Sequence, residues 1–147
     1  MLDAASGSLK WQQQLAHVDS RVISLDKHRR LAGATPSFAD GVLVCPTSAG
    51  AIVAVDISAR TLLWGYTYEN LNMVRGYPFS RTQLGNTTKR SKQWIDATLT
   101  IADGSVIATP VESSKLICLD LLTGKPQWKP LTRNKDLYVA CIHQGTI

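Results

Sequence analysis

The residues best suited to bind a ligand lie in one basic stretch near the middle of the chain. Positions 70–95 carry five cationic side chains and no acidic one, which equals the whole net charge of +5. Cations grip phosphates and carboxylates, and aromatic rings beside them add flat contact surfaces. The sequence therefore predicts contact with an anionic ligand or a protein partner through Arg75, Arg81, Lys89, Arg90, Lys92 and Trp94.

A solvated insertion, anchored to the rest of the protein by its aromatic residues, is the alternative interpretation of this stretch. A nucleic-acid role is not favoured, because the basic run is short and no known binding module accompanies it. A second basic cluster, Lys27–Arg30, lies earlier in the chain. If the two segments share a face, they form one electropositive rim.

The sequence contains no catalytic or metal-binding pattern. His17, His28 and His143 lack partners at metal spacing, and no nucleophile elbow or phosphate loop occurs. The cysteines, which form no Cys-x-x-Cys pair, are each expected to pack as a small apolar residue inside a strand, with a disulfide or metal role as the alternative. They are Cys45, Cys118 and Cys141. These absences favour a non-enzymatic protein.

A repeated motif predicts the strands on either side of the basic stretch. Three times an aspartate is followed eight residues later by a tryptophan, in Asp3–Trp11, Asp56–Trp64 and Asp120–Trp128. The carboxylate can accept hydrogen bonds from turn amides, and the indole offers roughly 150–250 Å² to bury. One small sheet cannot cover that ring, so we expect it to pack on a neighbouring repeat.

Between these motifs the pattern predicts short strands in two four-stranded meanders. Ala-Asp-Gly recurs at 39–41 and 102–104, a strong signal for tight hairpins, and His143–Gly145 occupies the same place a third time. Ala59 and Arg60 replace the favoured glycine turn, at an expected cost of about 1 kcal/mol. The expected strands are 8–15, then 35–38, 42–45, 52–56 and 61–67, then 97–101, 105–109, 115–120 and 126–129, and finally 137–142.

The motif Asp-x-x-Thr-Gly-x-x-x-Trp at 120–128, preceded by Lys-Leu-Ile-Cys-Leu, resembles the repeat of pyrroloquinoline-quinone (PQQ)-type β-propellers, often called the tryptophan-docking motif. The resemblance covers about 2–15, 34–68 and 97–147. It implies an all-β propeller of four-stranded antiparallel blades, here one partial propeller over 1–147. Its parts are the end of a blade (1–15), a blade (34–68), a basic insertion (69–96), a second blade (97–131) and the start of another (137–147). We therefore expect a piece of a larger propeller.

The resemblance also implies structural roles for seven blade-docking residues: Asp3, Trp11, Asp56, Trp64, Asp120, Gly124 and Trp128. This repeat occurs in quinoprotein dehydrogenases, in the propeller lipoprotein of the bacterial outer-membrane assembly machinery and in many secreted proteins. It implies a periplasmic or extracellular full-length protein, although this chain shows no signal peptide and no apolar run long enough to span a membrane.

The function that the resemblance implies is binding or scaffolding through variable loops between the blades. The alternative is a piece of a PQQ- and calcium-dependent dehydrogenase. Such enzymes are similar to one another in a pair of adjacent cysteines and a Glu/Asn/Asp calcium site, and this chain has neither pattern. PQQ and calcium are therefore expected only if blades outside this chain supply the site.

Overall fold

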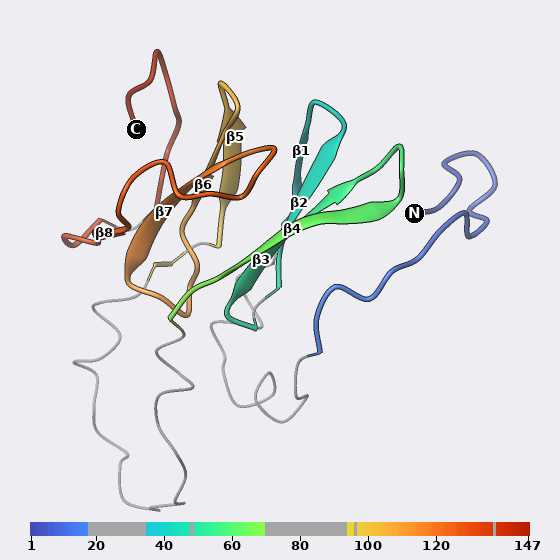
Figure 1. Cartoon of the computed structure of the whole chain (residues 1–147), viewed down its shortest axis with the longest axis horizontal. Coiled ribbons are helices and arrows are strands. Elements are labelled where there is room, and N and C mark those ends of the chain that lie inside the picture. The colour runs from blue at the N-terminus through green and yellow to red at the C-terminus, as the bar shows by residue number, and fades with distance from the viewer. Residues whose placement is uncertain (18–34, 48, 70–93, 96, 137) are drawn as a thin grey trace, which may run out of the picture.

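Eight strands form two separate antiparallel sheets in the computed structural model, which describes residues 1–17, 35–47, 49–69, 94–95, 97–136 and 138–147 (Figure 1). In each sheet the strands follow one another in chain order, as a meander. The fold is all-β across the described residues, as predicted. The first sheet contains β1 (Ser37–Ala39), β2 (Val42–Pro46), β3 (Ala51–Asp56) and β4 (Thr61–Thr67), and the second contains β5 (Leu99–Ala102), β6 (Ser105–Ala108), β7 (Lys115–Asp120) and β8 (Leu131–Thr132).

The two-residue Asp-Gly turns form as the sequence predicts. Asp40 and Gly41 have φ of 49° and 79°, and Asp103 and Gly104 have φ of 48° and 71°. Positive φ at both central residues is the type I′ geometry, whose twist matches that of the flanking strands. Gln144 and Gly145, at 47° and 73°, make a third such turn inside the His143–Thr146 bridge. This last turn repeats the opening hairpin of the two sheets.

The outer strands of the two sheets differ. Strand β4 pairs with β3 along its whole length, with one irregularity at Ala54 and Val55. The predicted strand 126–129 is wrong, because Pro126 makes only an isolated bridge and regular pairing resumes in β8. Proline donates no backbone hydrogen bond, so Pro126 and Pro130 interrupt the ladder on both sides of Trp128.

Neither predicted terminal strand forms. Residues 8–15 contribute only the Leu2–Leu9 bridge, and the described part of 137–142 has no strand assignment. A strand needs a neighbour to pair its backbone groups, and neither segment lies in a sheet of the described residues. The other predicted bounds agree with the structure to within two residues.

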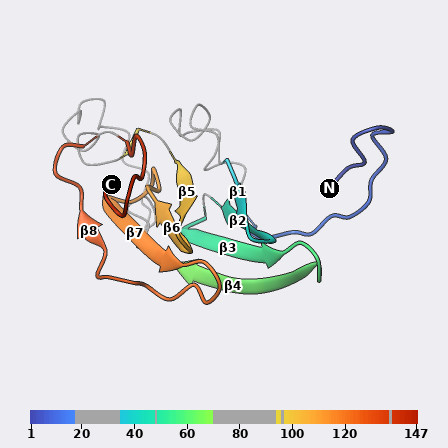
Figure 2. The same ribbon diagram turned by 90° about the horizontal axis from the view of Figure 1, so that it is seen from above.

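The core lies between the two sheets, which stand side by side with the N-terminal segment beyond the first (Figure 2). Alternate residues of β2, β3, β6 and β7 point to this layer, as the two-residue period of a strand requires. The described residues contain no helix of the length and apolarity that a membrane crossing demands. The core consists of Val42, Val44, Ile52, Ala54 and Trp64 from the first sheet and Leu99, Val106, Ala108, Ile117, Leu119 and Leu121 from the second.

Candidate functional site

Trp64 joins the two sheets. It lies on β4, and only 8% of its surface is exposed. Its Nε1 donates a hydrogen bond of 2.8 Å to the carbonyl oxygen of Leu121, just after β7. The ring packs over Gly124 so closely that a Cβ placed on Gly124 would lie 2.5 Å from Cδ2 of the indole. Only glycine fits beneath this ring.

The turn that receives Trp64 is organised by Asp120. Its Oδ1 accepts hydrogen bonds from the amides of Leu122 (3.2 Å) and Thr123 (2.8 Å) and from the Thr123 hydroxyl (2.7 Å). The Thr123 hydroxyl is the largest cause that holds the pKa of Asp120 below its ordinary value. Gly124, with φ of 67°, donates its N–H to the Asp120 carbonyl at 2.9 Å. The carboxylate therefore fixes both the glycine and the Leu121 carbonyl that the indole uses.

The corresponding turn of the first sheet lacks the glycine. The Asp56 carboxylate accepts a hydrogen bond of 2.8 Å from the Ala59 amide, and Arg60 takes φ of 56° where Gly124 has 67°. A side chain in this left-handed region costs about 1 kcal/mol, in line with the strain expected from the sequence. Arg60 is exposed, so its side chain has room.

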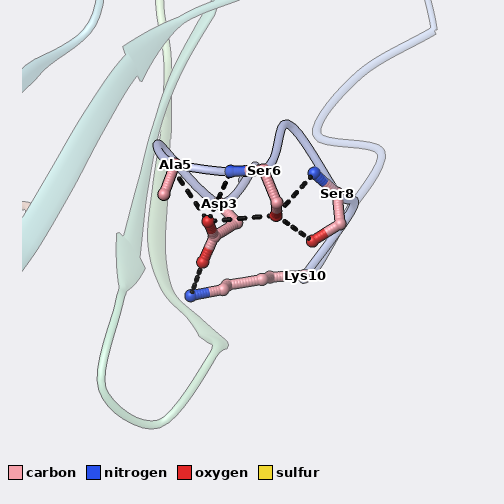
Figure 3. Close-up of polar contacts among 5 residues, drawn as sticks. All are labelled: Asp3, Ala5, Ser6, Ser8 and Lys10. Carbon is pink, nitrogen blue, oxygen red and sulfur yellow. Dashed lines mark hydrogen bonds and ion pairs between the residues drawn. The ribbon is translucent and has the colours of Figure 1, made fainter.

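The N-terminal segment carries a third turn of this kind (Figure 3). Oδ1 of Asp3 accepts bonds from the amides of Ala5 (3.0 Å) and Ser6 (2.9 Å) and from the Ser6 hydroxyl (3.1 Å). Gly7 has φ of 69° and donates its N–H to the Asp3 carbonyl at 2.8 Å. The ion pair with Lys10, 2.5 Å long, is the largest cause that lowers the pKa of Asp3 to about 2.

Two further hydrogen bonds cross between the sheets. The Tyr68 hydroxyl, just after β4, donates to Oε1 of Glu112 at 2.7 Å. Glu112 belongs to the connection between β6 and β7 and is 2% exposed. On the inner strands, the Ser37 hydroxyl donates to the Leu99 carbonyl. The two sheets are thus tied at β1, at the β6–β7 connection and at β4.

The predicted site residues fall in several places. Arg75, Arg81, Lys89, Arg90 and Lys92 lie outside the described residues, as does the cluster at 27–30. Trp94 is 5% exposed, and its Nε1 donates to the Lys115 carbonyl at 3.0 Å. The Arg133 guanidinium lies 5.9 Å from the centre of its ring, within reach of a cation–π interaction. This buried position agrees with the anchoring alternative.

Trp11 and Trp128 are both half-buried and lie outside regular strands. Trp128 borders a cavity of about 870 Å³ between the β7–β8 edge and the C-terminal segment. Trp94, Leu131, Tyr138 and Cys141 also line it. The cavity is bordered mainly by apolar side chains, so it suits an apolar or aromatic group.

The three cysteines differ in burial. Cys45 is half-buried and Cys118 is buried, and burial raises the pKa of both thiols. Cys141 was expected inside but is exposed, because the strand predicted around it does not form. No described group of three His, Cys, Asp or Glu residues is placed to hold one metal ion.

Three residues that make contacts between the two sheets, here called the junction, are not among the residues predicted from the sequence. They are Ser37, Tyr68 and Glu112. Neither Ser37, within β1, nor Tyr68, just after β4, belongs to a motif in the sequence. Glu112 carried a signal, because it is an isolated acid inside the largely apolar stretch 106–113, where a charge demands a partner.

The family described as outer membrane protein assembly factor BamB matches residues 1–142. The chain belongs to this family of PQQ-type repeat proteins. Comparison with curated proteins gave no match. The two sheets are therefore two blades of a PQQ-type β-propeller, and the Trp64 contact is a junction between blades.

Three solved structures are similar to this chain. BamB from Moraxella catarrhalis is 14% identical, with a TM-score of 0.43 over 65% of this chain and 21% of that one. A europium-containing methanol dehydrogenase is 16% identical, with a TM-score of 0.57 over 86% and 20%. A quinohemoprotein alcohol dehydrogenase from Comamonas testosteroni is 22% identical, with a TM-score of 0.40 over 66% and 13%. The chain thus spans about a fifth or less of their length, and the methanol dehydrogenase supports the fold alone.

Proposed function

We propose that this PQQ-type chain is a non-catalytic binding and scaffolding module, periplasmic or extracellular in the full-length protein. The observation that carries the proposal is the family match over residues 1–142, whose description is that of an assembly factor. The chemistry of the junction supports it. The carboxylates of Asp3 and Asp120 accept hydrogen bonds from their own turns, and Glu112 accepts one from Tyr68. These acids serve the architecture of the blades, which is what a tryptophan-docking scaffold requires.

The proposed contact surface is the segment between β4 and β5. The junction holds both of its ends, since Tyr68 bonds Glu112 before the segment and Trp94 bonds the Lys115 carbonyl at its close. A rigid blade pair that presents a loop is a common way to build a binding site. The partner we propose is an acidic protein surface or another anionic ligand, bound through Arg75, Arg81, Lys89, Arg90 and Lys92.

The experiment compares two triple variants with the same change in charge. The first carries Lys89→Gln, Arg90→Gln and Lys92→Gln in the loop. The control carries Lys125→Gln, Lys129→Gln and Lys135→Gln, which lie at exposed positions of the second blade and its following segment. Each lowers the net charge from +5 to +2, since three cations are removed. Fluorescence anisotropy with a labelled polyglutamate peptide measures binding over a range of salt concentrations.

We expect the loop variant to bind about tenfold more weakly, which is about 1.4 kcal/mol, and to lose part of its salt dependence. The control should keep most of its affinity, because only the global field changes. Equal losses in both variants would contradict a loop-specific site. A bound quinone in the absorbance spectrum of the full-length protein, or calcium-dependent dye reduction with alcohols, would favour the dehydrogenase alternative.

A further inference from the structure

The outer strands of the two blades differ in how they end their sheets. Strand β8 is two residues long, and Pro126 and Pro130 interrupt the segment before it. A short strand and prolines both hinder the pairing of one sheet edge with another. Strand β4 is seven residues long, contains neither proline nor lysine, and is exposed at most of its positions. The first blade therefore ends in a longer edge that is free of these obstacles.

The hydrogen bonds of β4 show which of its backbone groups point to this edge. Tyr68 donates its N–H to the Gly50 carbonyl at 2.9 Å, so these two residues form a hydrogen-bonded pair. In an antiparallel ladder such pairs alternate with pairs whose N–H and C=O groups point outward. Thr67 and Gly65, one and three residues before Tyr68, belong to the outward kind. Because β4 is the last strand of its sheet, these groups face no other strand of the described chain (Figure 2).

The side chains along β4 favour the close approach of a second strand. Leu62 and Leu63 are 56% and 40% exposed, and a strand laid beside them removes apolar surface from water. Gly65 has no side chain, and a Cβ placed on it would meet no atom within 4 Å. Two backbones can therefore come closest at Gly65.

The charges of β4 are complementary to those of an antiparallel copy of the same strand. Arg60 precedes the strand and Glu69 follows it, both are exposed, and no charged residue lies between them. Arg60 is five residues before Gly65, and Glu69 is four residues after it. A copy that runs antiparallel and pairs at Gly65 thus sets the arginine of each chain beside the glutamate of the other, within reach of a long side chain.

We propose that two copies of this chain associate through β4, antiparallel to one another and related by a two-fold axis at Gly65. Gly65 of each copy exchanges N–H···O=C hydrogen bonds with Gly65 of the other, and Thr67 pairs with Leu63. An Arg60–Glu69 ion pair lies at each end. Both copies use the same surface, so the assembly closes as a dimer. The inference rests on β4 and does not depend on the proposed binding function.

Charge reversal tests the antiparallel arrangement, with sedimentation velocity of the 147-residue chain as the measurement. Arg60→Glu gives a strand with two acidic ends and Glu69→Arg gives one with two basic ends, so each should weaken dimerisation about tenfold. An equimolar mixture, with one variant fluorescently labelled, should form heterodimers of wild-type affinity, because each acidic end then meets a basic one. The double variant should dimerise like the wild type.

A proline on the open edge tests the backbone hydrogen bonds. Thr67→Pro removes an outward N–H and leaves the bonds to β3 in place, so the dimer should weaken about tenfold or more while the sheet still forms. Thr132→Pro is the matched control and should dimerise like the wild type. Arg133 donates its N–H to the Ser114 carbonyl, so Thr132 also has an outward N–H, but on β8. Circular dichroism of both variants checks the sheets.

Three outcomes would overturn the proposal. A wild type that stays monomeric at every concentration leaves the edge of β4 to a strand of another protein. Dimers that survive Thr67→Pro are held by another surface. Charge variants that fail to pair with each other exclude the antiparallel arrangement, and they decide the question even where Thr67→Pro lowers stability. The triple variant at Lys89, Arg90 and Lys92 should dimerise like the wild type, which separates this inference from the binding function.

Discussion

The turns after β3 and β7 occupy the same place in two blades, yet only the second carries glycine. Arg60 adopts the left-handed conformation in the first blade, and Gly124 adopts it in the second. The turn therefore forms with or without glycine, at a cost of about 1 kcal/mol for the side chain. The two turns differ in their contact with Trp64, because its indole leaves no room for a Cβ at Gly124. The glycine is required by docking between blades and only favoured by the turn.

Removal of the docked ring should be the most damaging single change. Trp64→Ala deletes a buried indole and its hydrogen bond to Leu121, and we expect a loss of about 3–5 kcal/mol in the free energy of unfolding. Urea unfolding followed by circular dichroism measures it. Leu63→Ala, on the adjacent and 40% exposed residue, is the control and should cost less than about 1 kcal/mol. Equal losses would mean that the ring does not hold the blades together.

Gly124 is favoured by its left-handed conformation and required by its packing against the Trp64 indole, and substitutions can measure the two effects separately. Gly124→Ala combines a left-handed side chain with overpacking against the indole, so we expect a loss of about 2–4 kcal/mol. Gly41→Ala has the same type of φ without the clash and should cost only about 1 kcal/mol. In a Trp64→Ala background, the cost at Gly124 should fall to the Gly41 value. A cost that stays the same in that background would refute the docking explanation for this glycine.

The reverse exchange in the first blade should be mildly stabilising. Arg60→Gly relieves the left-handed side chain but gives the unfolded chain more freedom, so we expect a net gain of up to about 1 kcal/mol. Arg60→Ala keeps the strain and should stay within about 0.5 kcal/mol of the wild type. Thermal unfolding distinguishes the two variants. Destabilisation by Arg60→Gly would show that the arginine side chain makes a contact worth more than the strain.

The sequence predicts the features that depend on local turn chemistry and misses those that depend on neighbouring strands. The Asp-Gly hairpins and the bounds of β4 and β7 were predictable, because local turn chemistry and the spacing from Asp to Trp determine them. The outer strand of the second blade was misjudged, since Pro126 and Pro130 break a ladder that the repeat pattern alone would continue. The terminal segments failed for another reason, because a strand pattern has no effect without a neighbour to pair with.

The contacts that complete the junction had no local signature at all. Ser37 and Leu99 are 62 residues apart in the chain, and Tyr68 and Glu112 are 44 apart. Hydrogen bonds between such distant positions depend on how two sheets meet, which neither alternation nor turn motifs encode. The place of Trp64 above Gly124 was different, because the repeat itself indicated that the ring must be covered by the next unit.

The smallest expected effect concerns the Asp3 turn, which has the same hydrogen bonds as the Asp120 turn but lies in the largely exposed N-terminal segment. The pKa of Asp3 is about 2, below its ordinary value of 3.8, mainly because of the ion pair with Lys10. A lowered pKa means that the ionised turn is stabilised above about pH 3.8 and that this stabilisation is lost as the pH falls through 2. Nuclear magnetic resonance of the Ala5 and Ser6 amides, titrated between these values, follows the loss. Lys10→Gln should raise the midpoint toward 3.8, and Lys129→Gln should leave it unchanged. A midpoint insensitive to Lys10 would mean that hydrogen bonds from the turn hold the carboxylate without the ion pair, as at Asp120, where the Thr123 hydroxyl is the largest cause of the lowered pKa.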